Sequence, residues 1–175
     1  MKLSGSLTVD YQDDALCIAR ADRVQFTVYV QAMRSAHIPA ILRTAASMNQ
    51  QRPGGIVCLV LVLPHAPMVE TAVLQELRPH AETLGHLYQH VAVAIVPHGP
   101  LSLLIKAATR AAGVIRGRGS QISLHDDLFA GCRALADFAQ HRGWPALDPA
   151  ALKAQADELT ALLRTPARSS AAIAT

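Results

Sequence analysis

The chain has 175 residues, 51% of them hydrophobic and only 4% aromatic, which is enough for one domain with a sizeable aliphatic core and excludes a disordered chain. The formal net charge is +3 and the pI is about 9.0, a mild basic excess that suits an anionic partner but is spread along the sequence. Because proteins that bind single-stranded nucleic acid stack bases on aromatic rings, the scarcity of such rings argues against a nucleic-acid ligand.

Cysteine usage and hydropathy predict a cytoplasmic protein. The three cysteines, Cys17, Cys58 and Cys132, are odd in number, far apart and set in apolar segments, which favours reduced thiols in a reducing compartment. Residues 1–5 open no signal-peptide hydrophobic core, and no apolar run approaches the roughly 18 residues of a membrane span. We therefore expect no transmembrane segment.

The first part of the chain predicts a β-hairpin followed by a helical region. Two short, partly alternating runs at 6–10 and 15–20 are separated by turn-forming residues, as in a pair of antiparallel strands. Between 24 and 50 the apolar residues are spaced as in a helix, and a second helix is expected to begin near Pro39.

Two apolar runs, 56–63 and 91–96, predict buried strands, and each is followed by a Pro-His-small-Pro turn. A helical pattern lies between them at 68–89, with a kink or break expected at Pro79, and another helical pattern follows at 101–112. The repeated pattern indicates successive strand–helix units.

The last part of the chain predicts one more such unit and a separate helix. Residues 121–124 fit a short strand, and 127–140 fit a helix behind an acidic cap. After a boundary at 143–145, residues 148–164 have the pattern of an amphipathic helix, and 165–175 are expected to form a flexible tail.

This order predicts an α/β fold with a five-stranded mixed sheet, in which an antiparallel first hairpin is followed by parallel β-α units. Right-handed crossovers place the helices mainly on one face, and the extra C-terminal helix is additional to them. Because the central strands are apolar on both sides, the second face needs a cover, either this helix or a second copy of the chain. We divide the chain into an α/β domain at 1–142, a linker with the C-terminal helix at 143–164, and the tail.

Three local features resemble one family. They are the helix at 77–84 before a strand, the Pro-x-Gly-Pro-Leu-Ser sequence at 97–102 leading into a small-residue helix, and the strand with acidic cap and helix at 122–130. Together with the order of elements, they resemble the STAS-like domains of anti-sigma-factor antagonists, particularly divergent bacterial members, which are often grouped with lipid-binding Sec14-like domains. The resemblance covers roughly 6–140 and implies the fold and a binding role.

The family's regulatory members are switched by phosphorylation of a serine in an Asp-Ser-Ser/Thr-Gly turn after the central strand. Here that turn reads Leu63-Pro64-His65-Ala66-Pro67, which has no hydroxyl to phosphorylate. The favoured function is therefore a non-enzymatic regulatory or scaffolding module without this switch, acting on a protein partner or on itself as a homodimer. No nucleophile and base stand at a catalytic spacing, and no cofactor is implied.

The alternative function is a small-molecule module, for a lipid or a metabolite, at the carboxyl ends of the parallel strands. His65, His98 and His125 each follow a predicted strand at that edge, where ligands of α/β sheets usually bind. Three imidazoles there could hold zinc, or each could simply cap its loop. Ser102, in the first turn of the following helix, is a further ligand candidate, although such a serine more often caps the helix.

The densest basic stretch contains Lys106, Arg110, Arg116 and Arg118. These residues are a candidate patch for an anionic lipid, another anion or an acidic partner, and the other interpretation is favourable capping of a helix C-terminus.

Glu82, His86 and His90 are spaced four residues apart and would share one face of a continuous helix, which makes them a weak metal candidate. With only three ligands and no second shell, a solvated helix face is the other interpretation. We expect no metal site here.

Overall fold

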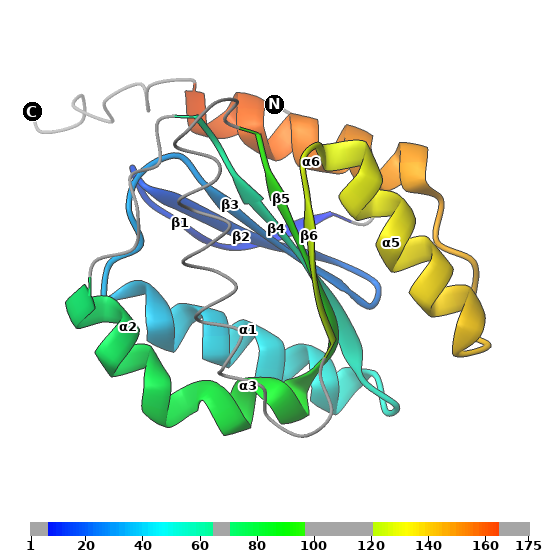
Figure 1. Cartoon of the computed structure of the whole chain (residues 1–175), viewed down its shortest axis with the longest axis horizontal. Helices are drawn as coiled ribbons and strands as arrows, with labels where there is room; N and C mark the ends of the chain where they lie inside the picture. Colours follow the sequence, from blue (N-terminus) through cyan, green and yellow to red (C-terminus); the bar gives the residue numbers. More distant parts are fainter. Residues whose placement is uncertain (1–6, 65–70, 97–120, 165–175) are drawn as a thin grey trace, which may run out of the picture.

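The computed structural model describes residues 7–64, 71–96 and 121–164, and within them a sheet of six strands is flanked by helices on both faces (Figure 1). The strands, in chain order and in spatial order, are β1 Thr8–Gln12, β2 Leu16–Ala21, β3 Val24–Tyr29, β4 Ile56–Val62, β5 Tyr88–Ile95 and β6 Gln121–His125. The described helices are α1 His37–Gln51, α2 Thr71–Leu77, the short 3-10 helix η1 Arg78–His80, α3 Ala81–Leu87, α5 Leu128–His141 and α6 Pro149–Arg164.

The predicted mixed sheet is confirmed, with one strand more than expected. Strands β1, β2 and β3 pair antiparallel, and β3, β4, β5 and β6 pair parallel. The additional strand is β3, whose residues 24–29 were expected to be helical. Val24, Phe26 and Val28 alternate with polar residues and point to one face, so their true period is two, and the four-residue spacing of Val24 and Val28 fits either structure.

Helices cover both faces of the sheet, rather than mainly one. The described crossover helices α1, α2 and α3 lie on one face, as the right-handed connection rule requires, whereas α5 and α6 lie together on the other (Figure 1). Leu135 of α5 and Leu159 of α6 are fully buried in one cluster with Phe26 and Leu59 of the sheet. The C-terminal helix thus covers the second sheet face within the same chain.

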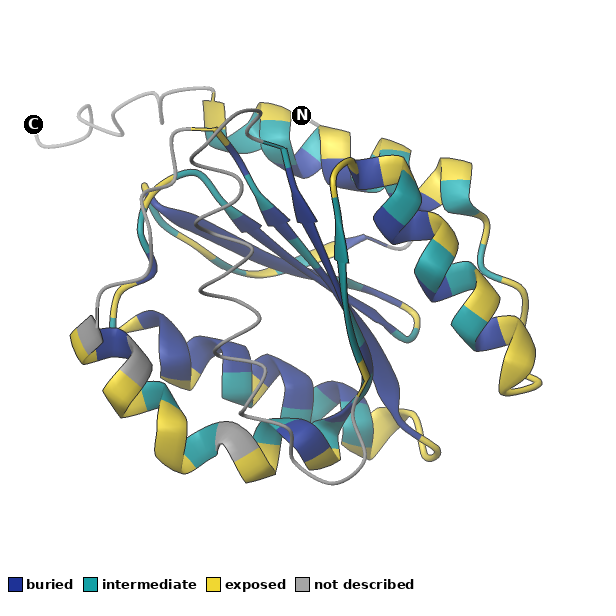
Figure 2. Ribbon diagram, in the orientation of Figure 1, coloured by how far each residue is buried: buried dark blue, intermediate teal, exposed yellow. Residues whose placement is uncertain are grey.

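The burial pattern follows this layering, with the central strands buried and the outer sides of the helices exposed (Figure 2). No helix among the described residues is long and apolar enough to cross a membrane.

Helix boundaries agree with the predicted capping signals in two places. The break expected at Pro79 is the 3-10 helix η1, between α2 and α3. The acidic cap is Asp127, whose Oδ1 accepts a hydrogen bond from the Ala130 N–H at 2.8 Å. The helix expected at 101–112 lies outside the described residues.

Candidate functional site

Most of the predicted site residues cannot be located in the part of the chain that the structure describes. The residues outside that part are His65, His98, Ser102, Lys106, Arg110, Arg116 and Arg118. The predictions for a strand-end site with these histidines and for a basic patch therefore stay predictions. His125 is described and lies, as predicted, at the carboxyl end of a parallel strand, β6.

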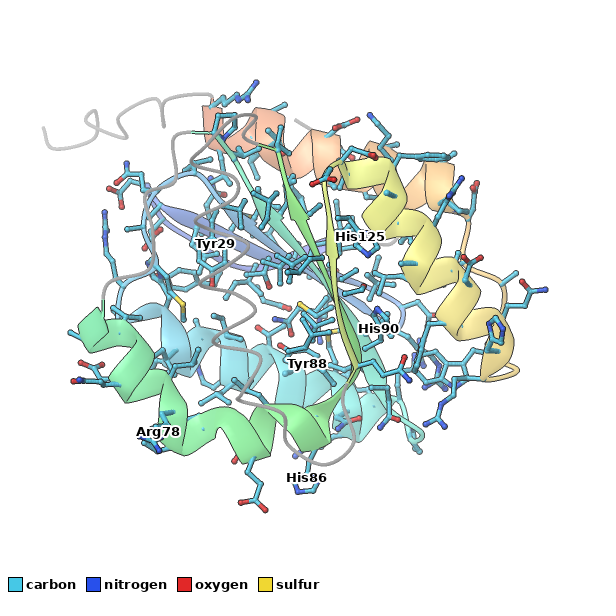
Figure 3. All side chains as sticks on the ribbon, in the orientation of Figure 1. Tyr29, Arg78, His86, Tyr88, His90 and His125 are labelled. Carbon is cyan, nitrogen blue, oxygen red and sulfur yellow. The ribbon has the colours of Figure 1, made fainter. Side chains whose placement is uncertain are left out.

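The weak metal candidate on one helix face is wrong, because the helix ends before its last member. Helix α3 stops at Leu87, so Glu82 and His86 form an exposed pair at 3.9 Å, while His90 belongs to strand β5 and is buried. Figure 3 shows His86 projecting away from the sheet, far from His90. Among the described residues, no group of three or more metal-ligating side chains comes together.

The structure instead brings His90 next to His125, through a serine between them (Figure 3). In the parallel register of β5 and β6, Ala92 lies opposite Ser123, so His90 and His125 stand on either side of that serine along the strands. The Nε2 atoms of both histidines lie 2.8 Å from the Ser123 Oγ. We call this set the His-Ser-His chain.

The single proton of the serine hydroxyl decides how this chain is bonded. A hydroxyl has one proton and two acceptor lone pairs, so Ser123 can donate to at most one imidazole and must accept from at least one. Burial lowers the pKa of His90, against a smaller opposing effect of Gln121, and burial also lowers the pKa of His125, against the nearby Asp127. Both rings are therefore predominantly neutral near pH 7, and the two tautomers are coupled through the serine.

One nitrogen of this chain has no hydrogen-bond partner. His90 is only 7% exposed, and its Nδ1 is buried without a hydrogen bond of normal geometry, although the Gln121 side chain lies close enough to the ring to raise its pKa. Leaving such a group unpaired costs about 1–3 kcal/mol, and among the described residues only the Gln25 Oε1 and Tyr88 Oη atoms share this state. In catalytic Ser-His sites a third group orients the base through this nitrogen, and no described residue bonds to it here.

His90 borders an open groove of about 530 Å³ between the edge of the sheet and helix α5. We call it the β6–α5 groove. Its sheet side comes from the amino ends of β5 and β6, and its helix side from the last two turns of α5. The described residues that line it are Gln89, His90, Gln121, Ala134, Phe138, His141 and Arg142. It therefore lies at the opposite end of the strands from the edge where the sequence places a ligand.

An aromatic ring forms the floor of the β6–α5 groove. The Phe138 ring lies 5.0 Å from the His90 ring, and 5.9 Å from the Trp144 ring in an edge-to-face contact. The Arg142 guanidinium lies 5.8 Å from the Phe138 centroid and donates a hydrogen bond to the Gln89 side-chain oxygen. The groove thus combines a flat apolar surface with a cation at its rim.

Gly55 controls the position of Gln89 in this groove. Gly54 and Gly55 have nearly the same backbone φ, +98° and +97°, but a Cβ on Gly55 would overlap the Gln89 Cγ, whereas a Cβ on Gly54 meets nothing closer than 4.0 Å. We expect Gly54→Ala to lose about 1–2 kcal/mol from left-handed strain, and Gly55→Ala to lose at least about 1 kcal/mol more from the overlap. Urea denaturation of both variants measures the difference, and equal losses would contradict a close contact with Gln89.

A second, smaller cavity of about 220 Å³ lies between β1, β2 and helix α1. It contains the ion pair of Arg20 with Asp10, whose charged atoms are 3.3 Å apart. Arg43 also lines this cavity, but the cavity has less than half the volume of the β6–α5 groove and is therefore the weaker ligand site.

The three cysteines are buried free thiols, in line with the predicted reduced state. Burial raises the pKa of each to about 12, so none is a thiolate nucleophile at neutral pH.

Sequence reasoning missed Ser123, Phe138 and Arg142 as site residues. Ser123 and His125 are two apart in a predicted strand, and Phe138 and Arg142 are four apart at a predicted helix end, so each pair could have been placed on a shared face. Their meeting with His90 depends on the register of β6 against β5, for which no local pattern exists.

Comparison with models of protein families and with curated protein sequences finds no match to this chain. The resemblance to STAS-like domains therefore stays a prediction.

Proposed function

We propose that this chain is a non-enzymatic binding module whose ligand is a small molecule held in the β6–α5 groove. The observation that carries the proposal is the buried, unpaired Nδ1 of His90 beside a groove of ligand size. A ligand atom that reaches this nitrogen would supply the hydrogen bond that the folded chain lacks. Gln121, which is exposed and close to His90, is the side chain that would move aside.

The chemistry of the site favours binding over catalysis. The Ser123 hydroxyl forms hydrogen bonds with the imidazoles of His90 and His125, and these two bonds restrict its orientation. A nucleophile needs a base whose far nitrogen is oriented by a third group, which the described residues do not provide at His90. With His90 as the base, the His-Ser-His chain is therefore suited to recognise a ligand rather than to attack one.

Binding of a protein partner or of a second copy, as in a cytoplasmic STAS-like regulator, is the second candidate function. The observation that favours it is the outer edge of β6, which no strand pairs in the described part of the chain. An open edge can accept a strand from another molecule.

Two measurements on the purified protein separate these candidates. Mass spectrometry of a denatured extract reports a co-purified small molecule, and light scattering reports the oligomeric state. A monomer with bound ligand supports the groove as the site, whereas a dimer without ligand supports association through a sheet edge.

A groove-filling variant tests the location of the ligand. Ala134 lines the β6–α5 groove from α5, and Ala134→Trp fills it, while Ala151→Trp adds the same ring to the exposed side of α6. We expect the extracted ligand to disappear from the first variant and to remain in the second. Equal ligand content in folded samples of both variants would contradict the proposal.

A further inference from the structure

The proposed function leaves the chemical class of the ligand open, and the following inference rests on that function. We infer that the β6–α5 groove takes a small planar anion, namely a carboxylate attached to a flat apolar ring. Two features point to this class, the charge at the rim and the aromatic floor, and the termination of helix α5 permits it.

The charge at the rim is not neutralised within the described part of the chain. Arg142 is exposed, and its described hydrogen-bond partner is the neutral amide oxygen of Gln89. The described lining residues include Arg142 and His141 but no carboxylate. Guanidinium and carboxylate form strong paired hydrogen bonds, so an anionic ligand is the natural counterpart of Arg142.

The C-terminal end of a helix ordinarily repels an anion, because its last carbonyl groups carry partial negative charge. At the end of α5 most of these carbonyls are already bonded. The N–H groups of Arg142, Gly143 and Trp144 donate to the carbonyls of Phe138, Gln140 and Ala139, and the His141 ring lies 2.6 Å from the Asp137 carbonyl. Gly143, with φ +67°, makes this turn possible. These bonds reduce the repulsion, and the positive charge of the adjacent Arg142 opposes what remains.

The floor selects a flat apolar group. The Phe138 ring lies beside the His90 ring at 5.0 Å, with the planes tilted by 48°, and the small side chain of Ala134 lines the same groove. Aromatic pairs with centroids 4.5–7 Å apart gain about 0.5–1.5 kcal/mol beyond their buried area, which rewards a ring in the ligand. The carboxylate would then lie between Arg142 and the free nitrogen of His90, which line the same groove, while the ring lies against Phe138.

A bound carboxylate also changes the proton balance of the groove. His125 and Gln121 of β6 and Phe138 of α5 lie close to His90, and Asp127 lies beside His125. His141, the last residue of α5, and Arg142, which follows it, line the same groove. An anion next to the free nitrogen favours the protonated imidazole, so the pKa of His90 is higher in the complex than in the free protein. Binding then takes up a proton, and the affinity rises as the pH falls through that higher pKa.

Benzoate and benzamide are suitable probes, since they share a ring and differ in charge. Trp144 is the only tryptophan of the chain and lies against Phe138, so its fluorescence reports binding. We expect benzoate to bind at least tenfold more tightly than benzamide at pH 7, and more tightly at pH 6 than at pH 8. Arg142→Gln should abolish the preference, whereas Arg78→Gln, which removes the same charge from exposed η1, should preserve it.

A failure of the anion inference can be distinguished from a failure of the proposed function. Equal affinity for both probes, or a preference for benzoate that survives Arg142→Gln in a folded protein, overturns the anion inference and leaves the groove as a binding site. A neutral or cationic molecule that is extracted from the wild type and absent from Ala134→Trp also overturns the anion inference and leaves the groove as a binding site. If neither probe binds and the extracts of both tryptophan variants match, the proposed function and the inference are both wrong.

Discussion

Replacing Asp13 with alanine is expected to lower the free energy of unfolding by about 2–4 kcal/mol, because the centre of a partly buried hydrogen-bond network disappears. Asp13 lies in the turn between β1 and β2, and its two carboxylate oxygens accept four hydrogen bonds. Oδ1 accepts from the backbone N–H groups of Ala15 and Leu16, both at 2.8 Å. Oδ2 accepts from the Tyr11 hydroxyl at 2.8 Å and bonds to the His37 Nε2 at 2.9 Å.

The expected loss of stability is large because His37 depends on Asp13 for a hydrogen bond. Its side chain is fully buried at the start of α1, and its Nδ1 accepts a hydrogen bond from the Arg34 N–H at 3.0 Å. The proton of this ring therefore sits on Nε2 and is donated to Asp13. Without that carboxylate, the buried N–H loses its partner and the connection between the first hairpin and helix α1 is broken.

The pKa of the Asp13 carboxyl also predicts how the stability of the fold depends on pH. Burial alone would raise the pKa of this carboxyl, but the hydrogen bonds from Ala15, Tyr11, Leu16 and His37 outweigh it and lower the pKa. An aspartate with a lowered pKa stabilises the fold above its unfolded value of about 3.9, and this contribution is lost as the pH falls through the lower, folded value. Wild-type stability should therefore decrease below about pH 4 with a component that Asp13→Asn lacks.

Urea denaturation at pH 7 and at pH 3 measures both effects. Asp14→Asn is the matched control, because Asp14 is the next residue and forms an exposed ion pair with Arg34 at 2.8 Å. We expect the control to remain close to wild type. If Asp13→Ala were as stable as Asp14→Asn, the four hydrogen bonds would not be a stabilising centre of the fold.

The sequence was sufficient for the parallel half of the sheet, because buried parallel strands are continuous apolar runs with turn residues at both ends. Runs 56–63 and 91–96 were found within a few residues of β4 and β5. Strand β3 was missed, since Val24 and Val28 fit a helical spacing, and only its pairing with β2 and β4 decides between the two. Tertiary pairing here overrides a local pattern that fits two structures.

The candidate site was harder to predict from the sequence, because its contacts also depend on tertiary pairing. His90 was assigned to a helix face, because the helical pattern of 68–89 contains no signal that would end the helix at Leu87. Once it is placed in β5 instead, its neighbours come from another strand and from the end of α5, more than thirty residues away in the sequence. Such cross-strand neighbours are set by register, which the residues of one segment do not encode.

Leu159→Ala is expected to lower the free energy of unfolding by about 2–5 kcal/mol, the usual range for a leucine removed from a packed core. Leu159 is fully buried and lies in the largest described core cluster with Leu152 and Ala156 of the same helix. These three residues are spaced four and three apart, so they form one stripe of α6 that faces α5 and strands β2 and β3.

Leu162→Ala is the matched control, because it makes the same change on the same helix at a half-buried position. We expect it to lose clearly less stability, and both variants to keep the oligomeric state of the wild type in light scattering. A Leu159→Ala protein as stable as Leu162→Ala would show that α6 does not cover the sheet in solution. The second face would then need another cover, and a dimer with concentration-dependent stability would supply it. The same comparison therefore decides whether the helix after residue 148 is part of the domain core.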